Sequence, residues 1–164
     1  MEYLEIIKAK VFDWETLPNI LTVWRFQSKK VVFTNGCFDI LHLGHIDYLS
    51  KARSLGDILI VGVNTDDSVK RLKGSNRPIT DETSRSLIMA SLHFVDAVVL
   101  FDQDTPYELI ELVQPDILVK GKDYKAEEVV GYDIVTKKGG EVITLDILEG
   151  FSTSAIEQKI RSSK

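Results

Sequence analysis

Five short runs of apolar, mostly β-branched residues alternate along the chain with segments whose apolar residues recur at helical spacing. Each run is continuously apolar, which is typical of strands covered on both faces. The pattern therefore predicts a parallel sheet whose strands are separated by helices. The predicted strands are Lys30–Thr34, Asp57–Asn64, Ala97–Phe101, Asp116–Lys120 and Glu141–Leu145, and the predicted helices lie near residues 43–55, 81–92, 106–113, 126–138 and 153–162.

This alternation predicts an α/β fold: a doubly wound, five-stranded parallel sheet with helices on both faces. Ligands of such sheets bind outside the carboxyl ends of the strands, near the point at which the strand order reverses. The loops that follow the strands are therefore the candidates for a functional site.

An N-terminal extension, residues 1–28, precedes the predicted domain of residues 29–164. Its large apolar residues recur at roughly helical spacing after Asp13, which is placed to cap a helix. We expect the extension to pack on the domain as a helix. The residues at this spacing are Trp14, Leu17, Leu21, Trp24 and Phe26.

The composition narrows the function classes. With 25 acidic and 20 basic residues in 164, the formal charge of −5 argues against broad binding to nucleic acid or to an anionic membrane. No apolar run approaches the ~20 residues of a membrane-spanning helix, and the N-terminal residues carry acids where a signal peptide carries bases. Cys37 is the single cysteine, which fits a reducing compartment. We therefore expect a cytoplasmic protein.

The loop after the first predicted strand contains His42 and His45 on either side of Gly44. Neither the glycine pattern of dinucleotide-binding enzymes nor the P-loop pattern occurs in the chain. On a helix the two histidines lie about 60° apart, at the top of the buried stripe. They would face the carboxyl edge of the sheet at a helix N-terminus, whose free N–H groups and dipole favour an anion. Gly44 would let a phosphate approach the backbone closely.

Two other interpretations of the histidines stay open. They could be packed and hydrogen-bonded in the core, which is the commoner role of a single histidine. They could also be zinc ligands, although Asp39 is the one obvious third ligand nearby and no paired cysteines accompany it.

A second candidate site follows the second predicted strand, where four basic residues occur within eight positions. In an acidic protein such a cluster at a strand end favours phosphate binding over a solvated helix face. One turn into the next helix, Arg85 is either a further ligand contact or an ordinary surface charge. The four bases are Lys70, Arg71, Lys73 and Arg77.

Two further strand ends carry polar groups. The loop from Lys120 to Tyr124 suits a ribose or base contact, although it is also an ordinary polar turn. The hydroxyls of residues 152–154 stand at a predicted helix start, where they cap the helix or hold a polyphosphate.

The histidine loop matches a known motif. Residues 34–39 read Thr-Asn-Gly-Cys-Phe-Asp and residues 42–45 read His-Leu-Gly-His. Together they resemble the (T/S)-x-G-x-F-D-x-x-H-x-G-H signature of the cytidylyltransferase-type nucleotidyltransferases. Segments throughout residues 29–162 are similar to the adenylyltransferase domains of that family that make ADP-heptose. The family's fold is a Rossmann-like sheet of strand order 3-2-1-4-5.

The resemblance implies an adenylyltransferase reaction. An oxygen of a sugar 1-phosphate, D-glycero-β-D-manno-heptose 1-phosphate, attacks the α-phosphorus of ATP and releases pyrophosphate. The attacking phosphate is already ionised, so positioning and charge stabilisation must supply the rate. The resemblance also implies Mg²⁺ bound with ATP, a homo-oligomer such as a dimer, and a separate sugar kinase that makes the sugar 1-phosphate.

The same resemblance implies a role for each candidate residue. The catalytic residues are His42, His45 and Lys73. The nucleotide- and phosphate-binding residues are Thr34, Asn35, Gly36, Phe38, Asp39, Gly44, Lys120, Gly121, Asp123, Ser152, Thr153 and Ser154. The acceptor-binding residues are Asn64, Arg77, Arg85 and Tyr124.

Two alternative functions stay open. A glycerol-3-phosphate cytidylyltransferase, or another enzyme of the family with a different acceptor, would share the histidine motif. The glycerol-phosphate enzymes carry Arg-Thr-Glu-Gly before their final Ser-Thr, whereas residues 148–151 here read Leu-Glu-Gly-Phe. A non-catalytic nucleotide sensor would bind ATP but would release no pyrophosphate.

Overall fold

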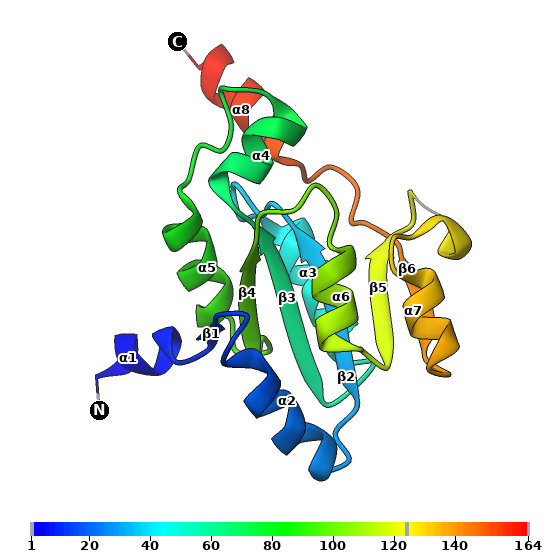
Figure 1. Cartoon of the computed structure of the whole chain (residues 1–164). Coiled ribbons are helices and arrows are strands. Elements are labelled where there is room, and N and C mark those ends of the chain that lie inside the picture. The colour runs from blue at the N-terminus through cyan, green and yellow to red at the C-terminus, as the bar shows by residue number, and fades with distance from the viewer. Residues whose placement is uncertain (1, 124, 164) are drawn as a thin grey trace.

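The computed structural model describes residues 2–123 and 125–163. Six parallel strands form one sheet in the order β1-β4-β3-β2-β5-β6, with helices on both faces (Figure 1). The strands are β1 (Val11–Phe12), β2 (Val31–Gly36), β3 (Ile58–Asn64), β4 (Ala97–Phe101), β5 (Ile117–Gly121) and β6 (Glu141–Leu145). The helices are α1 (Tyr3–Lys8), α2 (Leu17–Phe26), α3 (Leu43–Arg53), α4 (Asp66–Lys73), α5 (Glu82–Ser91), α6 (Tyr107–Val113), the 3₁₀ turn η1 (Ala126–Glu128), α7 (Tyr132–Lys137) and α8 (Thr153–Ser162).

The predicted fold class is confirmed. The five predicted strands are β2 to β6, and their spatial order corresponds to the expected 3-2-1-4-5. β2 pairs with β3 on one side and with β5 on the other, so the strand order reverses at β2. The loop after β2 is therefore at the position where a doubly wound sheet binds its ligand.

The N-terminal extension differs from the single helix that we expect from the sequence. It forms α1, β1 and α2, and β1 pairs with β4 to add a sixth strand to the sheet. Asp13 does cap the turn before α2, because its carboxylate accepts the backbone N–H of Thr16 at 2.7 Å. Phe26, however, is 91 % exposed. A two-residue strand is too short to show a periodicity, so the pattern could not reveal β1.

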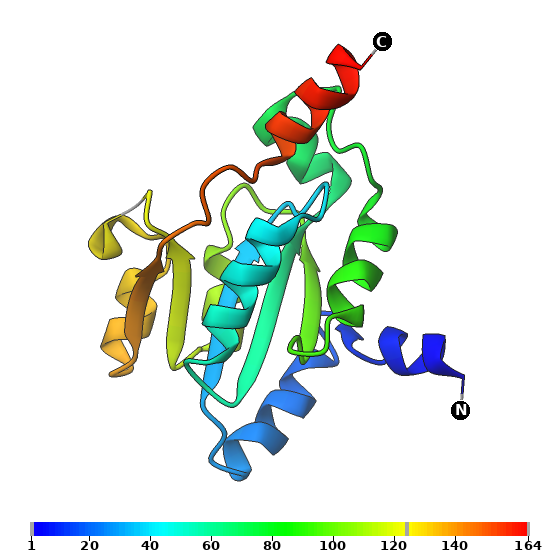
Figure 2. The same ribbon diagram turned by 180° about the vertical axis from the view of Figure 1, so that it is seen from behind.

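The helices divide the apolar residues into two cores, one on each face of the sheet. Val32 and Val61 belong to the core that includes residues of α3 and α5, and their neighbours Phe33 and Ile60 belong to the core that includes residues of α2, α6 and α7. Figure 2 shows α3 and α5 on the face that lies behind the sheet in Figure 1. Burial on both faces explains why the strand sequences are continuously apolar.

Two helical segments differ from the sequence pattern. α4 is not predicted, because Val69 is the one apolar side chain that it buries. The predicted helix 126–138 is divided into η1 and α7 at Gly131, where φ is +90°. No helix in the described part of the chain is both long enough and apolar enough to cross a membrane.

Candidate active site

A cavity of about 510 Å³ opens at the carboxyl ends of β2 and β5, between the N-termini of α3 and α8. It brings together loops that are far apart in the sequence. The predicted site residues that line it are Asn35, Gly36, Phe38, Asp39, His42, Gly44, His45, Lys73, Lys120, Gly121, Asp123, Ser152, Thr153 and Ser154.

The two histidines face each other at the N-terminus of α3. His42 is the N-cap residue, and its ring stacks on that of His45 with 3.8 Å between the centroids and 21° between the planes. The edge of the Phe38 ring packs against His45 at 5.3 Å. The Nδ1 atom of each histidine is buried and has no hydrogen-bond partner among the described residues. Both Nδ1 atoms are therefore available to hydrogen-bond a ligand.

Burial keeps both rings neutral at neutral pH. It lowers the pKa of His45 to about 4, and the charge of Lys73, together with that of His42 when His42 is protonated, adds to this effect. Burial also lowers the pKa of His42. Two stacked imidazolium rings would repel each other, so a neutral pair is the stable state of the free protein. A polyanion in the cavity would raise both pKa values and strengthen the hydrogen bonds that the rings donate.

Gly44 permits the close approach of the cavity walls. A Cβ at this position would lie 3.1 Å from Cε1 and Nδ1 of His42 and 3.2 Å from the Cβ of Phe151. The glycine therefore lets the histidine pair and the chain before α8 approach each other across α3.

The expectation that four bases gather at the site is wrong for three of them. Lys70 pairs with Asp67 at 2.9 Å. Arg71 pairs with Asp102 and Asp104 in the loop that follows β4. Arg77 is also held by carboxylates. Lys73 is the member of the cluster that lines the cavity, and the described residues offer it no ion pair.

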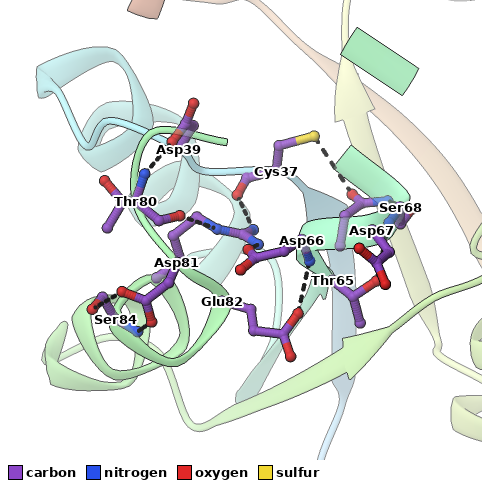
Figure 3. Close-up of polar contacts among 12 residues, drawn as sticks. Cys37, Asp39, Thr65, Asp66, Asp67, Ser68, Thr80, Asp81, Glu82 and Ser84 are labelled. Carbon is purple, nitrogen blue, oxygen red and sulfur yellow. Dashed lines mark hydrogen bonds and ion pairs between the residues drawn. The ribbon is translucent and has the colours of Figure 1, made fainter. Parts of the chain in front are cut away.

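Asp39 lies on the cavity wall, but its carboxylate is committed to the protein. It accepts the backbone N–H of Thr80 at 2.9 Å (Figure 3). It also accepts the backbone N–H of Ile79 at 2.7 Å and pairs with Arg77 at 2.6 Å. Burial opposes its ionisation, yet these hydrogen bonds outweigh burial and hold the pKa of Asp39 below its ordinary value. Asp39 therefore fixes the segment 77–80 against the histidine loop.

Arg85 is fully buried and does not reach the cavity. Its guanidinium donates to the carbonyls of Thr80 and Cys37 and to the carboxylate of Asp66, all at 2.7–2.9 Å. Figure 3 shows Cys37, Thr80 and Asp66 gathered from three separate segments. Arg85 thus joins the loops around the cavity, which differs from the acceptor contact that the resemblance implies.

Asn64 and Thr34 are also directed into the protein. The amide of Asn64 donates to the Ser68 hydroxyl at 3.0 Å. The Thr34 hydroxyl lies 2.8 Å from the hydroxyl of Tyr48, which in turn donates to the carbonyl of Val119. Both residues are buried and neither lines the cavity. The structure thus places both side chains outside the cavity lining, and the roles that the resemblance implies for them stay predictions.

Lys120 stands at the end of β5, where burial lowers its pKa to about 8. Its Nζ donates to the side-chain oxygen of Asn35 at 2.5 Å, across the cavity floor between β5 and β2. At neutral pH the protonated form of the Lys120 amine still predominates, so this side chain can attract a ligand phosphate. The start of α8 faces it with three hydroxyl residues, of which Ser152 caps the helix by accepting the N–H of Ala155 at 3.1 Å.

The chain matches the cytidylyltransferase-like family model over residues 33–163. It belongs to the cytidylyltransferase-like family. Membership makes it a nucleotidyltransferase by class, and the match includes the histidine loop between β2 and α3.

Curated relatives of this cytidylyltransferase-like chain are named bifunctional protein HldE. The protein from Nitratiruptor sp. is 57 % identical over 150 residues, which are 92 % of this chain and 32 % of the relative. The protein from Campylobacter jejuni serotype O:2 is also 57 % identical, and the match covers 98 % of this chain and 35 % of the relative. The chain thus spans about a third of the length of these relatives.

Solved structures extend the comparison. A lipopolysaccharide core biosynthesis protein from Thermoplasma volcanium is 38 % identical, with a TM-score of 0.60 over 73 % of this chain and 97 % of that one. A pantoate-beta-alanine ligase from Francisella tularensis has the same TM-score at 16 % identity, which shows a shared fold alone.

Among residues 2–123 and 125–163, no three histidine, cysteine, aspartate or glutamate side chains are placed to hold a metal ion together. A zinc site at His42 and His45 would need such a third ligand. Magnesium bound with ATP needs less, because it keeps phosphate and water ligands.

Four cavity residues were not predicted from the sequence: Cys37, Tyr48, Ile147 and Phe151. Cys37 lies within the histidine motif and Tyr48 lies three residues after it, so their closeness to the motif indicates that they belong to the site. Ile147 and Phe151 are apolar residues in a loop, and only the fold brings that loop to the site. Tyr124, a predicted acceptor contact, lies outside the described residues.

Proposed function

We propose that this chain is an adenylyltransferase that joins ATP and D-glycero-β-D-manno-heptose 1-phosphate to give ADP-heptose and pyrophosphate. The observation that carries the proposal is the stacked pair of His42 and His45, which faces the same cavity as Lys73 and the hydroxyls of residues 152–154. The identity to the HldE proteins and the similarity of the loops to ADP-heptose-forming domains support the choice of acceptor.

The reaction needs no covalent intermediate and no general base. A phosphate oxygen of the sugar 1-phosphate forms a bond to the α-phosphorus of ATP, and the bond from that phosphorus to the bridging oxygen breaks. The electron pair of that bond leaves with pyrophosphate. Because the attacking oxygen is already ionised, the protein must hold the reactants in line and stabilise the charge that grows on the phosphates.

The cavity residues divide this work by position. His42 and His45 donate to the α-phosphate and to the bridging oxygen, with the free N–H groups at the start of α3 beside them. Lys73 neutralises the polyphosphate or the incoming sugar phosphate. The hydroxyls of residues 152–154 hold the pyrophosphate that leaves, while Lys120, Gly121 and Asp123 contact the nucleoside or the sugar.

The remaining predicted acceptor residues support the site from within the protein. Asn64, Arg77 and Arg85 are engaged by Ser68, Asp39 and Asp66 respectively. We therefore propose that they fix the loops around the cavity and that the acceptor meets other groups. A homodimer, and a separate sugar kinase upstream, remain part of the proposal.

The test is pyrophosphate release by the purified chain with Mg-ATP or Mg-CTP and a panel of acceptors. The panel contains heptose 1-phosphate, glycerol 3-phosphate, pantetheine phosphate and riboflavin phosphate. We expect release with Mg-ATP and heptose 1-phosphate, and a product of the mass of ADP-heptose. Preference for Mg-CTP with glycerol 3-phosphate would establish the cytidylyltransferase alternative. Nucleotide binding without release from any acceptor would establish the sensor.

A further inference from the structure

The helix that carries one wall of the cavity is weakly attached to the rest of the protein. α8 begins with the hydroxyl residues 152–154, yet none of its residues is buried and none belongs to either core. Figures 1 and 2 show α8 beyond the carboxyl edge of the sheet, alongside α4. The packing that fixes α3 and α5 is therefore missing at α8.

One side chain links α8 to the histidine loop. Arg77 directs Nη1 to Asp39 at 2.6 Å and Nη2 to Glu157 on α8. Within residues 2–123 and 125–163, the contact between Arg77 and Glu157 is the one side-chain hydrogen bond that joins α8 to another element. A guanidinium can serve two carboxylates at once because its donors form a planar fork, which the single ammonium of a lysine cannot reproduce.

The link is shielded and its inner end is rigid. The side chains of Asp39, Arg77 and Glu157 are 1 %, 14 % and 23 % exposed. Asp39 is held in turn by two backbone N–H groups of the segment 77–80. An ion pair between shielded partners of fixed geometry is stronger than the usual surface pair.

The charges explain why the link matters for an anion. Asp39 lines the cavity, and Glu157 lies one turn after residues 152–154. Without Arg77, two carboxylates would stand beside the place where a polyphosphate binds and would repel it. Arg77 thus neutralises them while it sets the distance between the two walls.

We propose that Arg77 is a positioning residue that joins Asp39 to Glu157 and thereby holds the start of α8 against the histidine loop, so that residues 152–154 can receive the terminal phosphates of a nucleotide. The inference rests on the proposed function only in treating the cavity as a triphosphate site. It does not depend on which nucleotide or acceptor is used.

The first experiment measures hydrogen exchange in the ligand-free protein. Glu157→Gln removes the charge on α8 and leaves the inner pair of Arg77 and Asp39 in place. We expect exchange in residues 153–162 to become at least about fivefold faster, since the outer anchor of the helix is lost, while β2 and β3 stay unchanged. Asp67→Asn is the control, because it breaks an exposed pair with Lys70 on the neighbouring helix.

The second experiment measures affinity for magnesium pyrophosphate, Mg-ATP and Mg-CTP by calorimetry, together with steady-state kinetics. We expect Glu157→Gln and Arg77→Lys each to weaken binding of pyrophosphate and of the preferred nucleotide about 5- to 10-fold, with kcat changed less than about threefold. The double variant should be no weaker than either single variant, because both remove the same contact.

The two proposals fail separately. Unchanged exchange of α8 and unchanged pyrophosphate affinity in Glu157→Gln would overturn the role of Arg77, whatever acceptor the enzyme uses. Additive losses in the double variant would overturn it too, since the two residues would then act independently. Failure of the wild-type chain to form ADP-heptose would overturn the proposed function and leave the exchange and pyrophosphate results to decide the role of Arg77.

Discussion

The turn between β2 and α3 and the segment from α4 to Arg85 are both rich in groups that can bind phosphate, but they present them differently. In the turn, His42 and His45 face the cavity, and their Nδ1 atoms have no partner among the described residues. In the segment, Arg71, Arg77 and Arg85 each donate to a carboxylate of the protein. The two histidines are therefore available to a ligand, whereas the three guanidinium groups are already engaged by the protein.

The difference arises because, among the described residues, carboxylates pair with the arginines of the segment but not with the two histidines. The chain carries more carboxylates than bases, and several of them surround the α4 segment. An arginine there lowers its free energy by pairing locally, because its fork matches a carboxylate. At the histidine turn the ring of Phe38 packs against His45, and burial keeps the pKa of both imidazoles low, so they stay neutral and available.

The largest expected effect comes from the histidine turn. His45→Ala should lower kcat by about 10²–10³, the usual result of removing one preorganised donor to a developing negative charge. The measurement is pyrophosphate release at saturating substrates, with His93→Ala, at an exposed site remote from the cavity lining, as the control. A folded His45→Ala protein with wild-type turnover would remove the histidine pair from the mechanism.

The buried arginine should affect stability more than substrate recognition. Arg85→Met leaves Asp66 and the carbonyls of Cys37 and Thr80 without their donor, so we expect the free energy of unfolding to fall by about 3 kcal/mol. Urea unfolding checks this value. The matched control is Arg71→Met, which breaks an exposed cluster and should lower the free energy of unfolding by less than about 1 kcal/mol.

A different outcome would restore the acceptor role of Arg85. If Arg85→Met kept its unfolding free energy and instead raised the KM for the sugar phosphate, the guanidinium would have to leave its buried partners when substrate binds.

The lysines of α4 allow the sharpest test of the contrast between paired and available bases. Lys73→Ala should lower kcat/KM about tenfold, since it removes a charge that faces the cavity. Lys70→Ala and Lys51→Ala should lower kcat/KM less than about twofold, because these lysines pair with Asp67 and Asp47 at the surface. Steady-state kinetics of the three variants measure these values. Equal losses of kcat/KM would contradict the assignment of Lys73 to the cavity.

The sequence predicts the parts of this protein whose signal is local. The strands β2 to β5 are visible because burial on both faces makes each a largely apolar run, and the histidine turn is visible because its motif is contiguous. β6 is visible as a short β-branched run, although none of its residues is buried. Whether Arg77 faces a ligand or a carboxylate depends on Asp39 and Glu157, which lie 38 and 80 residues away. No spacing rule links such distant positions, so the ion pairs of Arg77 can be found only from the folded structure. The same holds for β1, which is recognisable only by its pairing with β4.

The smallest expected effect is a change in how stability depends on pH. The pKa of His45 is about 4 in the folded protein and about 6.5 in the unfolded chain. Between these values the unfolded chain binds a proton that the folded protein does not, so the free energy of unfolding should fall as the pH is lowered from about 6.5 towards 4. His45→Gln should reduce this slope, because it removes the group that binds this proton in the unfolded chain. Urea unfolding at a series of pH values measures it, and an unchanged slope in His45→Gln would mean that burial of this ring does not keep it neutral.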